Sequence, residues 1–317
     1  MKFALIVDSC KVNSYLVRDG KAYTLSNPDI PYQFHHSVGN ECFIGFWGYP
    51  FVFDGCFINW SEWNELPNLD LDVIFVVIEK RIDECKIEYL RKKYPNSIII
   101  GYLKETWNWN IEWESRIKIF NECDKVFICV SDINLFPELI NHCSSEISFL
   151  PQPVNVDYLY DNFYSEYKSE SIFAYYPVHN YPRQGNTMKF TEYISNKYNI
   201  PFFSTHTQNE KNQWHEFLKQ WTKATFHFNL DPIPIYPGQQ AIQCATLGII
   251  HIGGVNDSHN ILWPETATNN LDILEERFVE YLNNYEKRID IIKNTFNKVN
   301  EIYSFEAIRN KFKEIIK

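Results

Sequence analysis

The sequence predicts an α/β protein made of two doubly wound domains, and three observations lead to this prediction. Short apolar runs that are typical of strands alternate with longer segments that are typical of helices, and this alternation stops at residues 151–171 and then resumes. The strand-like runs are almost continuously apolar, as expected for parallel strands covered on both faces. A length of 317 residues suits two domains of about 150 residues each.

The first half of the chain contains six apolar runs that we predict to be strands. Helix-compatible segments precede the last three of them, as in successive strand–helix–strand units. The predicted strands are residues 3–8, 42–49, 72–79, 97–103, 125–131 and 147–151, and the predicted helices are residues 83–95, 113–123 and 133–143.

Residues 151–171 are rich in polar, aromatic and turn-forming side chains, so we predict a linker there. After it the alternation returns, and further helices complete the chain. The predicted strands of this half are residues 172–178, 200–205, 224–230 and 249–252, and the predicted helices include residues 187–198, 209–221, 241–247 and 305–317.

The composition argues against several classes of protein. The formal net charge of −10 and the absence of a long basic run argue against global attraction to nucleic acid or to an anionic membrane, although a local basic patch remains open. No apolar run approaches the length of a membrane span, and the N-terminal apolar run is too short for a signal peptide. The eight cysteines show no Cys-x-x-Cys pair and no metal-ligand spacing, which favours reduced thiols in a cytoplasmic protein.

A loop and helix start in the second half form the strongest candidate for a ligand site. Tyr236, Pro237 and Gly238 make a turn after the strand at 224–230, and ligands of doubly wound sheets bind where such strands end. Gly238 would let the backbone approach a ligand, and the start of the following helix favours an anion such as a diphosphate. Gln239, Gln240 and Gln243 are suited to hydroxyl groups; alternatively, Gly238 only makes a turn and the glutamines are exposed helix residues.

These residues resemble part of the E-G-x-G-x-x-x-x-E-A-x-A-x-G motif of the retaining GT-B glycosyltransferases of the E-x7-E type (glycosyl transferases group 1). Gly238 falls on the internal glycine of that motif, five residues before Gln243. Both motif glutamates are replaced, the first by Ile235 and the second by Gln243. Residues 151–160 also resemble the segment that joins the two domains in that family.

The resemblance implies two Rossmann-like domains that face a central cleft. It implies an acceptor-binding domain at 1–154, a linker at 155–170, a donor-binding domain at 171–300 and a C-terminal helix at 301–317 that packs back on the first domain. The implied activity is transfer of a sugar from a UDP- or GDP-sugar donor to an acceptor hydroxyl, with retention, without a metal or any other cofactor. Gln243 would then contact the ribose of the nucleotide.

In the same family an Arg and a Lys that follow the first strand of the second domain neutralise the diphosphate. Here His179 falls on the Arg position, Gln184 on the Lys position and Gly185 on a glycine. Arg183 lies one residue from the expected Lys, and its long side chain could reach phosphate oxygens. The other interpretation of Arg183 is an exposed loop charge.

The first domain would hold the acceptor, whose identity stays open between a glycan, a small molecule and a modified DNA base. Asp8 ends the first strand, and Glu105 follows the fourth, so either carboxylate could deprotonate an acceptor hydroxyl. His35, His36 and Trp107 are the further acceptor-site candidates, with the indole suited to stack on a sugar face.

Two other functions remain open at this point. One is an inverting GT-B transferase that glycosylates a modified DNA base, with Asp8 as the base. The other is a catalytically silent protein that binds sugar nucleotides, which the loss of both motif glutamates would explain.

Overall fold

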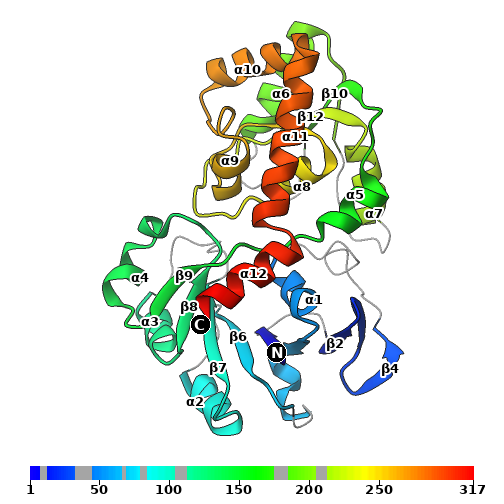
Figure 1. Cartoon of the computed structure of the whole chain (residues 1–317). Helices are drawn as coiled ribbons and strands as arrows, with labels where there is room; N and C mark the ends of the chain where they lie inside the picture. The colour runs from blue at the N-terminus through cyan, green and yellow to red at the C-terminus, as the bar shows by residue number, and fades with distance from the viewer. Residues whose placement is uncertain are drawn as a thin grey trace. The chain divides into compact units, whose positions relative to one another are not determined.

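A computed structural model shows two compact units, which we describe separately. It describes residues 1–7, 13–32, 45–65, 69–78, 84–103, 113–174, 185–204 and 213–317. Within these ranges, unit 1 contains the residues up to Pro153 together with Phe305–Lys317, and unit 2 contains Val154–Ser304. Figure 1 shows the ribbon coloured from the N-terminus in blue to the C-terminus in red.

Unit 1 is built on a nine-stranded sheet with the order β4-β3-β2-β5-β1-β6-β7-β8-β9. The strands from β5 to β9 in this order are parallel, and β2, β3 and β4 extend the edge beside β5 in antiparallel fashion. Their bounds are β1 Phe3–Val7, β2 Tyr15–Arg18, β3 Lys21–Thr24, β4 Asn27–Pro31, β5 Cys56–Asn59, β6 Val73–Ile78, β7 Ile98–Leu103, β8 Lys125–Ile128 and β9 Glu146–Phe149.

Helices cover both faces of this sheet, which explains why β1 and β6 are buried along their whole length. On one face, Phe312 of α12 (Phe305–Ile315) packs on Phe75 of β6 and on Phe53 of α1 (Tyr49–Phe53). On the other face, Phe120 of α3 (Trp113–Asn121) lies so close to Gly101 of β7 that a Cβ there would be 2.7 Å from its ring. The C-terminal helix therefore belongs to the core of unit 1. The remaining helices of unit 1 are η1 Gly45–Gly48, η2 Trp60–Glu65, α2 Glu84–Lys93, η3 Ile133–Leu135 and α4 Pro137–His142.

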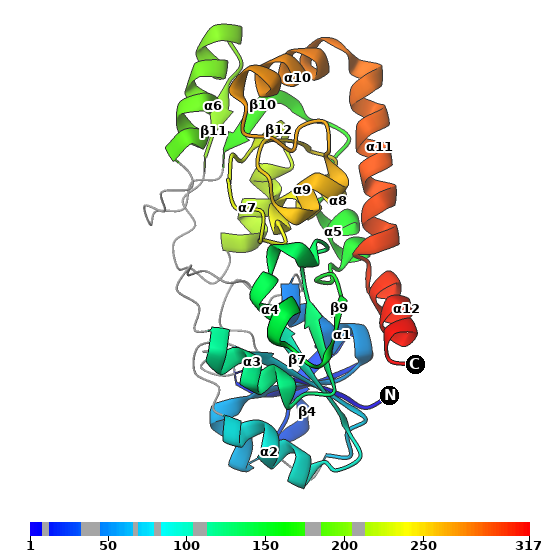
Figure 2. The ribbon, with the colours of Figure 1, turned by 90° about the vertical axis from the view of Figure 1, so that its left-hand side faces the viewer.

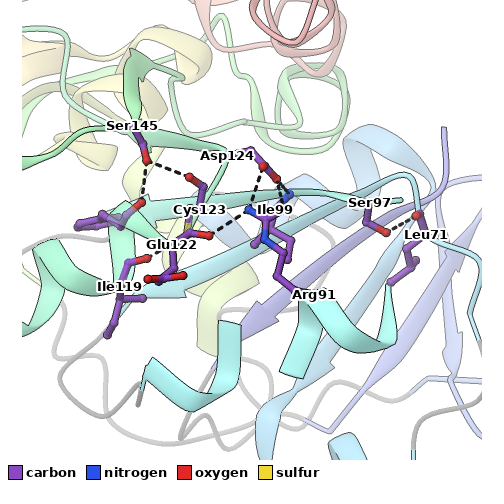
Figure 3. Close-up of polar contacts among 10 residues, drawn as sticks. Leu71, Arg91, Ser97, Ile99, Ile119, Glu122, Cys123, Asp124 and Ser145 are labelled. Atoms are coloured by element: carbon purple, nitrogen blue, oxygen red, sulfur yellow. Dashed lines mark hydrogen bonds and ion pairs between the residues drawn. The ribbon is translucent and has the colours of Figure 1, made fainter. Parts of the chain in front are cut away.

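One polar cluster fixes α2 to the sheet. Both carboxylate oxygens of Asp124 accept hydrogen bonds from the Arg91 guanidinium at 2.8 Å, and one of them also accepts from the backbone N–H of Ile99 at 2.7 Å (Figure 3). Arg91 donates in addition to the carbonyl of Glu122 at 3.0 Å. Because the pair is exposed, its net stabilisation is small, and its effect is to set the position of α2 against β7 and β8.

Unit 2 is built on a parallel four-stranded sheet with the order β11-β10-β12-β13. Its helices lie around this sheet, and α11 is the long orange-red helix in Figures 1 and 2. The bounds are β10 Ser169–Ala174, β11 Phe202–Phe203, β12 Ala224–Phe228, β13 Ile250–Ile252, α5 Val156–Phe163, α6 Gly185–Tyr198, α7 Gln213–Trp221, α8 Gln239–Leu247, α9 Asp257–Leu262, α10 Leu271–Asn283 and α11 Tyr285–Ile302.

One sequence expectation is wrong in the described residues. The apolar run at 42–49 is not a strand where it is described, because η1 and the start of α1 occupy residues 45–49 and Pro50 stands in the first turn of α1. The segment 155–170, predicted as the linker, contains α5 and belongs to unit 2, and the Asn155 side chain accepts from the backbone N–H of Tyr158 and so caps that helix. Among the helices of the described residues, none is both long enough and apolar enough to cross a bilayer.

Candidate functional site

The strand order of unit 2 reverses at the carboxyl ends of β10 and β12, where a ligand crevice is expected. The chain leaves β10 for β11 on one side and then returns to β12 on the other side. In a parallel sheet this reversal separates the two connections that follow the central strands, and ligands bind there. The connection after β12 is described as residues 229–238, which is the loop that the sequence singled out.

Two helices begin at this edge of the sheet, and neither has an acidic residue in its first turn. Helix α6 follows β10 and starts at Gly185, while α8 follows β12 and starts at Gln239. Gly238, at the N-cap of α8, provides no side-chain cap. Helix N-termini carry partial positive charge and N–H groups that need acceptors, so this edge favours a group with two or more negative oxygens.

Hydrogen bonds hold the loop after β12 in one shape. The Asn229 side chain donates to Gln240 Oε1 at 2.7 Å and accepts from the backbone N–H of Asp231 at 3.1 Å. The backbone N–H of Leu230 donates to Thr187 Oγ1 of α6 at 3.0 Å, which ties the loop to the first turn of that helix. The two helix starts are therefore parts of one connected structure.

The end of the loop also packs against α9. Backbone N–H groups of Asp257 and Ser258 donate to the carbonyls of Tyr236 and Pro237 at 2.9 and 3.2 Å, and the Ser258 hydroxyl donates to the Gly238 carbonyl at 2.6 Å. Tyr236 and Pro237 are buried, so their rings serve the packing of this turn. These backbone contacts fix the position of the turn against α9.

Gly238 has a structural role that the sequence did not reveal. Its φ is +73°, and a Cβ atom would lie 2.6 Å from Ser258 Oγ and 2.9 Å from Asn256 Cβ. The glycine is therefore required by the contact with α9 as well as by its left-handed backbone. Its predicted contact with a donor stays a prediction.

The three glutamines differ in their surroundings. The Gln240 side chain accepts the hydrogen bond from Asn229 described above. Gln239 is half-buried and lies four residues before Gln243, on the same face of α8. Gln243 is only 3% exposed, so its amide is held close to the protein interior. A ligand at the start of α8 would meet Gln239 first, and a role for Gln243 in ribose binding stays a prediction.

Most of the other predicted site residues lie outside the described residues. This holds for the catalytic candidates Asp8, Glu105 and Arg183. It holds also for His179 and Gln184 of the loop after β10, and for the acceptor-site candidates His35, His36 and Trp107. Of the remaining donor-site candidates, Gly185 is the first residue of α6, and Tyr236, Pro237, Gly238, Gln239 and Gln243 lie in the turn before α8 and in its first half.

Beneath the candidate site lies a chain of three fully buried histidines that sequence reasoning did not group. His227 of β12 and His251 of β13 are neighbours in the parallel register, and their Nδ1 atoms are 2.9 Å apart. Nε2 of His251 lies 3.4 Å from Nδ1 of His259 in α9. The signal available in the sequence was the pair of histidines in adjacent apolar strands, at 227 and 251.

Burial sets the charge of these imidazoles. It lowers the pKa of His227 and of His259 to about 3, and that of His251 well below its usual value, with the neighbouring histidines adding to the effect for His227 and His251. All three are neutral at pH 7. Since each is 0% exposed, none can exchange protons directly with a bound substrate.

The same region contains a group of side chains that could hold a metal ion. One ligand atom each of His227, His251 and Cys244 lies within 4.8 Å of the others, and all three residues are buried. The two Nδ1 atoms are already at hydrogen-bonding distance from one another, which is shorter than the spacing of two nitrogens on a tetrahedral zinc ion. The two Nδ1 atoms therefore bond to one another rather than to a shared ion, while Nε2 of His227 and Nε2 of His259 are buried without a hydrogen-bond partner among the described residues.

No family model and no curated protein sequence matches this chain. Solved structures match its fold over most or all of its length. HepE from Anabaena in complex with UDP is 9% identical with a TM-score of 0.60, and the match covers 100% of this chain and 99% of that one. A glycosyltransferase from Rickettsia africae is 11% identical with a TM-score of 0.58, covering 99% and 97%. An α,α-trehalose-phosphate synthase (UDP-forming) from Burkholderia vietnamiensis is 9% identical with a TM-score of 0.60, covering 81% and 74%.

These likenesses establish the fold. The chain has the α/β GT-B fold of these glycosyltransferases, as the sequence predicted. At such low identities they do not carry over any residue of a binding site, so the place of this chain within the E-x7-E group stays a prediction.

Proposed function

We propose that the protein is a glycosyltransferase that moves a sugar from a nucleotide-sugar donor to an acceptor hydroxyl, with retention. The observation that carries the proposal is the pair of acid-free helix starts, α6 and α8, at the carboxyl edge of the sheet in unit 2. A diphosphate is the part of a nucleotide sugar that such an edge would bind. The GT-B fold, and the UDP bound to the similar HepE, support the same class of ligand.

In this proposal unit 2 binds the donor. Helix starts and Arg183 would stabilise the charge that develops on the leaving diphosphate, with His179, Gln184 and Gly185 beside it. Gln239 and Gln243 would supply neutral hydrogen bonds to hydroxyl groups, and the turn Tyr236–Gly238 would shape the site. We expect a UDP-sugar rather than a GDP-sugar, since UDP is the nucleotide bound to HepE.

Unit 1 would bind the acceptor in this proposal. Asp8 and Glu105 are the candidates for removing the proton of the acceptor hydroxyl, and His35, His36 and Trp107 for contacting its body. The replacement of both motif glutamates, by Ile235 and Gln243, favours one second candidate function, which is donor binding without turnover.

Thermal shift with UDP, GDP and their common sugar conjugates tests the proposal on the full chain. A ligand present at 100 times its Kd should stabilise the chain by about 2.7 kcal/mol. A nucleotide sugar that binds should then be hydrolysed slowly, or transferred when an acceptor is present, and the configuration of the product reports retention. Absence of any shift would refute the proposal, while a shift without turnover would select the silent protein.

Gln243 gives the sharper test of the site. Gln243→Ala should raise the donor KM by about tenfold with little change in kcat, because a ribose contact contributes equally in the ground and transition states. Gln220→Ala is the matched control, since Gln220 is an exposed glutamine in α7. If Gln243→Ala leaves both kinetic constants unchanged, the assignment of the ribose site is wrong.

A further inference from the structure

A second cavity lies in unit 2, at the opposite end of α8 from the candidate donor site. It has a volume of about 460 Å³ and is bounded by α5, the segment that leads into β10, the last turns of α8, and α11. This volume is in the range of small-molecule sites. No step of the proposed transfer uses it.

Two cationic side chains in this cavity are largely buried, and their partners offset little of the cost of removing the charge from water. Lys168 donates to the carbonyls of Thr222 and Leu247 at 3.1 and 2.9 Å, and within the described part of the chain no carboxylate pairs with it. Burial lowers its pKa to about 8, so it is still mostly charged at pH 7. The ammonium also lies over the Tyr164 ring, 5.5 Å from its centroid, and a buried cation whose partners are all uncharged is stabilised further by an anion.

Arg288 of α11 is the second cation. Both of its terminal nitrogens reach a single oxygen of Glu170, at the long distances of 3.3 and 3.4 Å, and its Nε has no acceptor among the described residues. The Arg288 side chain is 13% exposed, whereas that of Glu170 is 57% exposed. The carboxylate therefore lies toward solvent and the guanidinium lies deeper, with N–H donors left for another oxyanion.

Aromatic rings form the walls and mouth of the cavity. The rings of Tyr160 and Tyr164 stack with centroids 4.5 Å apart, and Phe296 lies 5.1 Å from Tyr160. Tyr160 is 40% exposed and Tyr285 66% exposed, which is unusual for large side chains that gather in one place. Such rings bind the C–H faces of a sugar, and the nearby Ser165 and Glu166 offer acceptors for its hydroxyls.

We propose that this cavity is a binding site for an acidic sugar, in which Lys168 and Arg288 bind the oxyanion and the exposed rings of Tyr160 and Tyr285 contact the sugar ring. The oxyanion is either a phosphate ester or a uronate carboxylate. The site is separate from the donor site, because Ala245 and Gly248 line it at the end of α8, whereas the donor site is proposed at Gln239.

Calorimetric titration of the full chain with glucose 6-phosphate, glucuronate and glucose tests the proposal. At least one of the two acidic sugars should bind with a Kd in the millimolar range or below, and glucose should bind more weakly. Arg288→Gln should weaken the binding by about tenfold or more, because it removes a charge-assisted contact. Lys298→Gln, an exposed position on the same helix outside the cavity, should leave it unchanged.

The two acidic probes decide which oxyanion the cavity takes, and either one supports the site if Arg288→Gln weakens its binding. Gln243→Ala should leave the affinity unchanged, which separates this site from the donor site and keeps the test independent of the proposed transfer. Lack of saturable binding by both acidic sugars would overturn the proposal. So would equal affinity of the wild type and Arg288→Gln.

Discussion

The three buried histidines predict a steep loss of stability in mild acid. His227, His251 and His259 are neutral in the folded chain because burial depresses their pKa values, two of them to about 3. In the unfolded chain each has a pKa near 6.5. Between these values the unfolded state binds protons that the folded state does not, so their contribution to stability is present above pH 6.5 and is lost as the pH falls toward 3.

The magnitude follows from proton linkage. Lowering the pH from about 7 to about 5.5 should cost about 1.2 kcal/mol for each such histidine, and about 4 kcal/mol for the three together. The free energy of unfolding of a typical domain is only about 5–15 kcal/mol, so unit 2 should be only marginally stable at the lower pH. Other groups also titrate in this range, and a comparison of variants is needed to isolate the histidines.

Urea unfolding of the wild type, His227→Asn and His259→Asn at the two pH values provides that comparison. Both variants remove a titrating ring, and the amides keep a polar group near the nitrogen that takes part in the contact. Each variant should be less stable than the wild type at neutral pH but should lose about 1.2 kcal/mol less on acidification. His142→Asn, which removes an exposed imidazole in α4, should follow the wild type. Equal acid sensitivity of all four proteins would refute the reasoning.

Three further predictions follow from single contacts. Gly238→Ala should lower the free energy of unfolding by about 1–3 kcal/mol, measured as a fall in Tm. Gly20→Ala is the control and should cost less, because its φ is a similar +70° but no atom lies within 4 Å of the new Cβ. Equal falls in Tm would show that the contact with Ser258 is unimportant. Phe312→Ala should destabilise unit 1 by about 3–5 kcal/mol in urea unfolding, because the ring is 0% exposed among core aromatics, and a loss below about 1 kcal/mol would contradict the assignment of α12 to that core. Burial lowers the pKa of Lys168 to about 8, below that of a lysine in the unfolded chain. Between about pH 8 and 10.5 this lysine should therefore make the free energy of unfolding rise with pH, and Lys168→Met should lack that rise. Parallel plots of unfolding free energy against pH for the two proteins would count against the prediction.

The sequence predicted the parallel core of both sheets because continuous apolar runs leave few alternatives to buried strands. It failed at residues 45–49 of the run predicted as a strand, which form η1 and the start of α1, since an apolar run alone does not distinguish a short buried helix from a buried strand. It also gave no sign of the hairpin strands β3 and β4, which are exposed or half-buried and have no apolar pattern.

In the candidate site, too, features set by residues close in sequence could be predicted, and features set by residues distant in sequence could not. The glycine and helix start at Gly238 follow from local sequence chemistry, and the structure places them at the switch point of the sheet. The requirement for Gly238 set by Ser258 and Asn256 depends on residues about twenty positions away, so no local pattern could reveal it. The histidine chain likewise depends on the register of β12 with β13 and on the placement of α9.

Together, these features suggest what the replacement of both motif glutamates does to the charge of the proposed donor site. In the proposed donor site, the first turn of α8 carries no acidic residue, Gln243 is neutral, and the histidines underneath are neutral at pH 7. A diphosphate at the start of α8 would then meet the helix dipole without repulsion from a carboxylate at position 235 or 243. The loss is on the side of the transferred sugar, because Ile235 has no polar atom that could accept a hydrogen bond from a sugar hydroxyl, whereas Gln243 is assigned to the ribose that UDP itself carries. Affinity in such a site would therefore depend more on the diphosphate than on the sugar, and we expect UDP alone to bind nearly as tightly as any UDP-sugar.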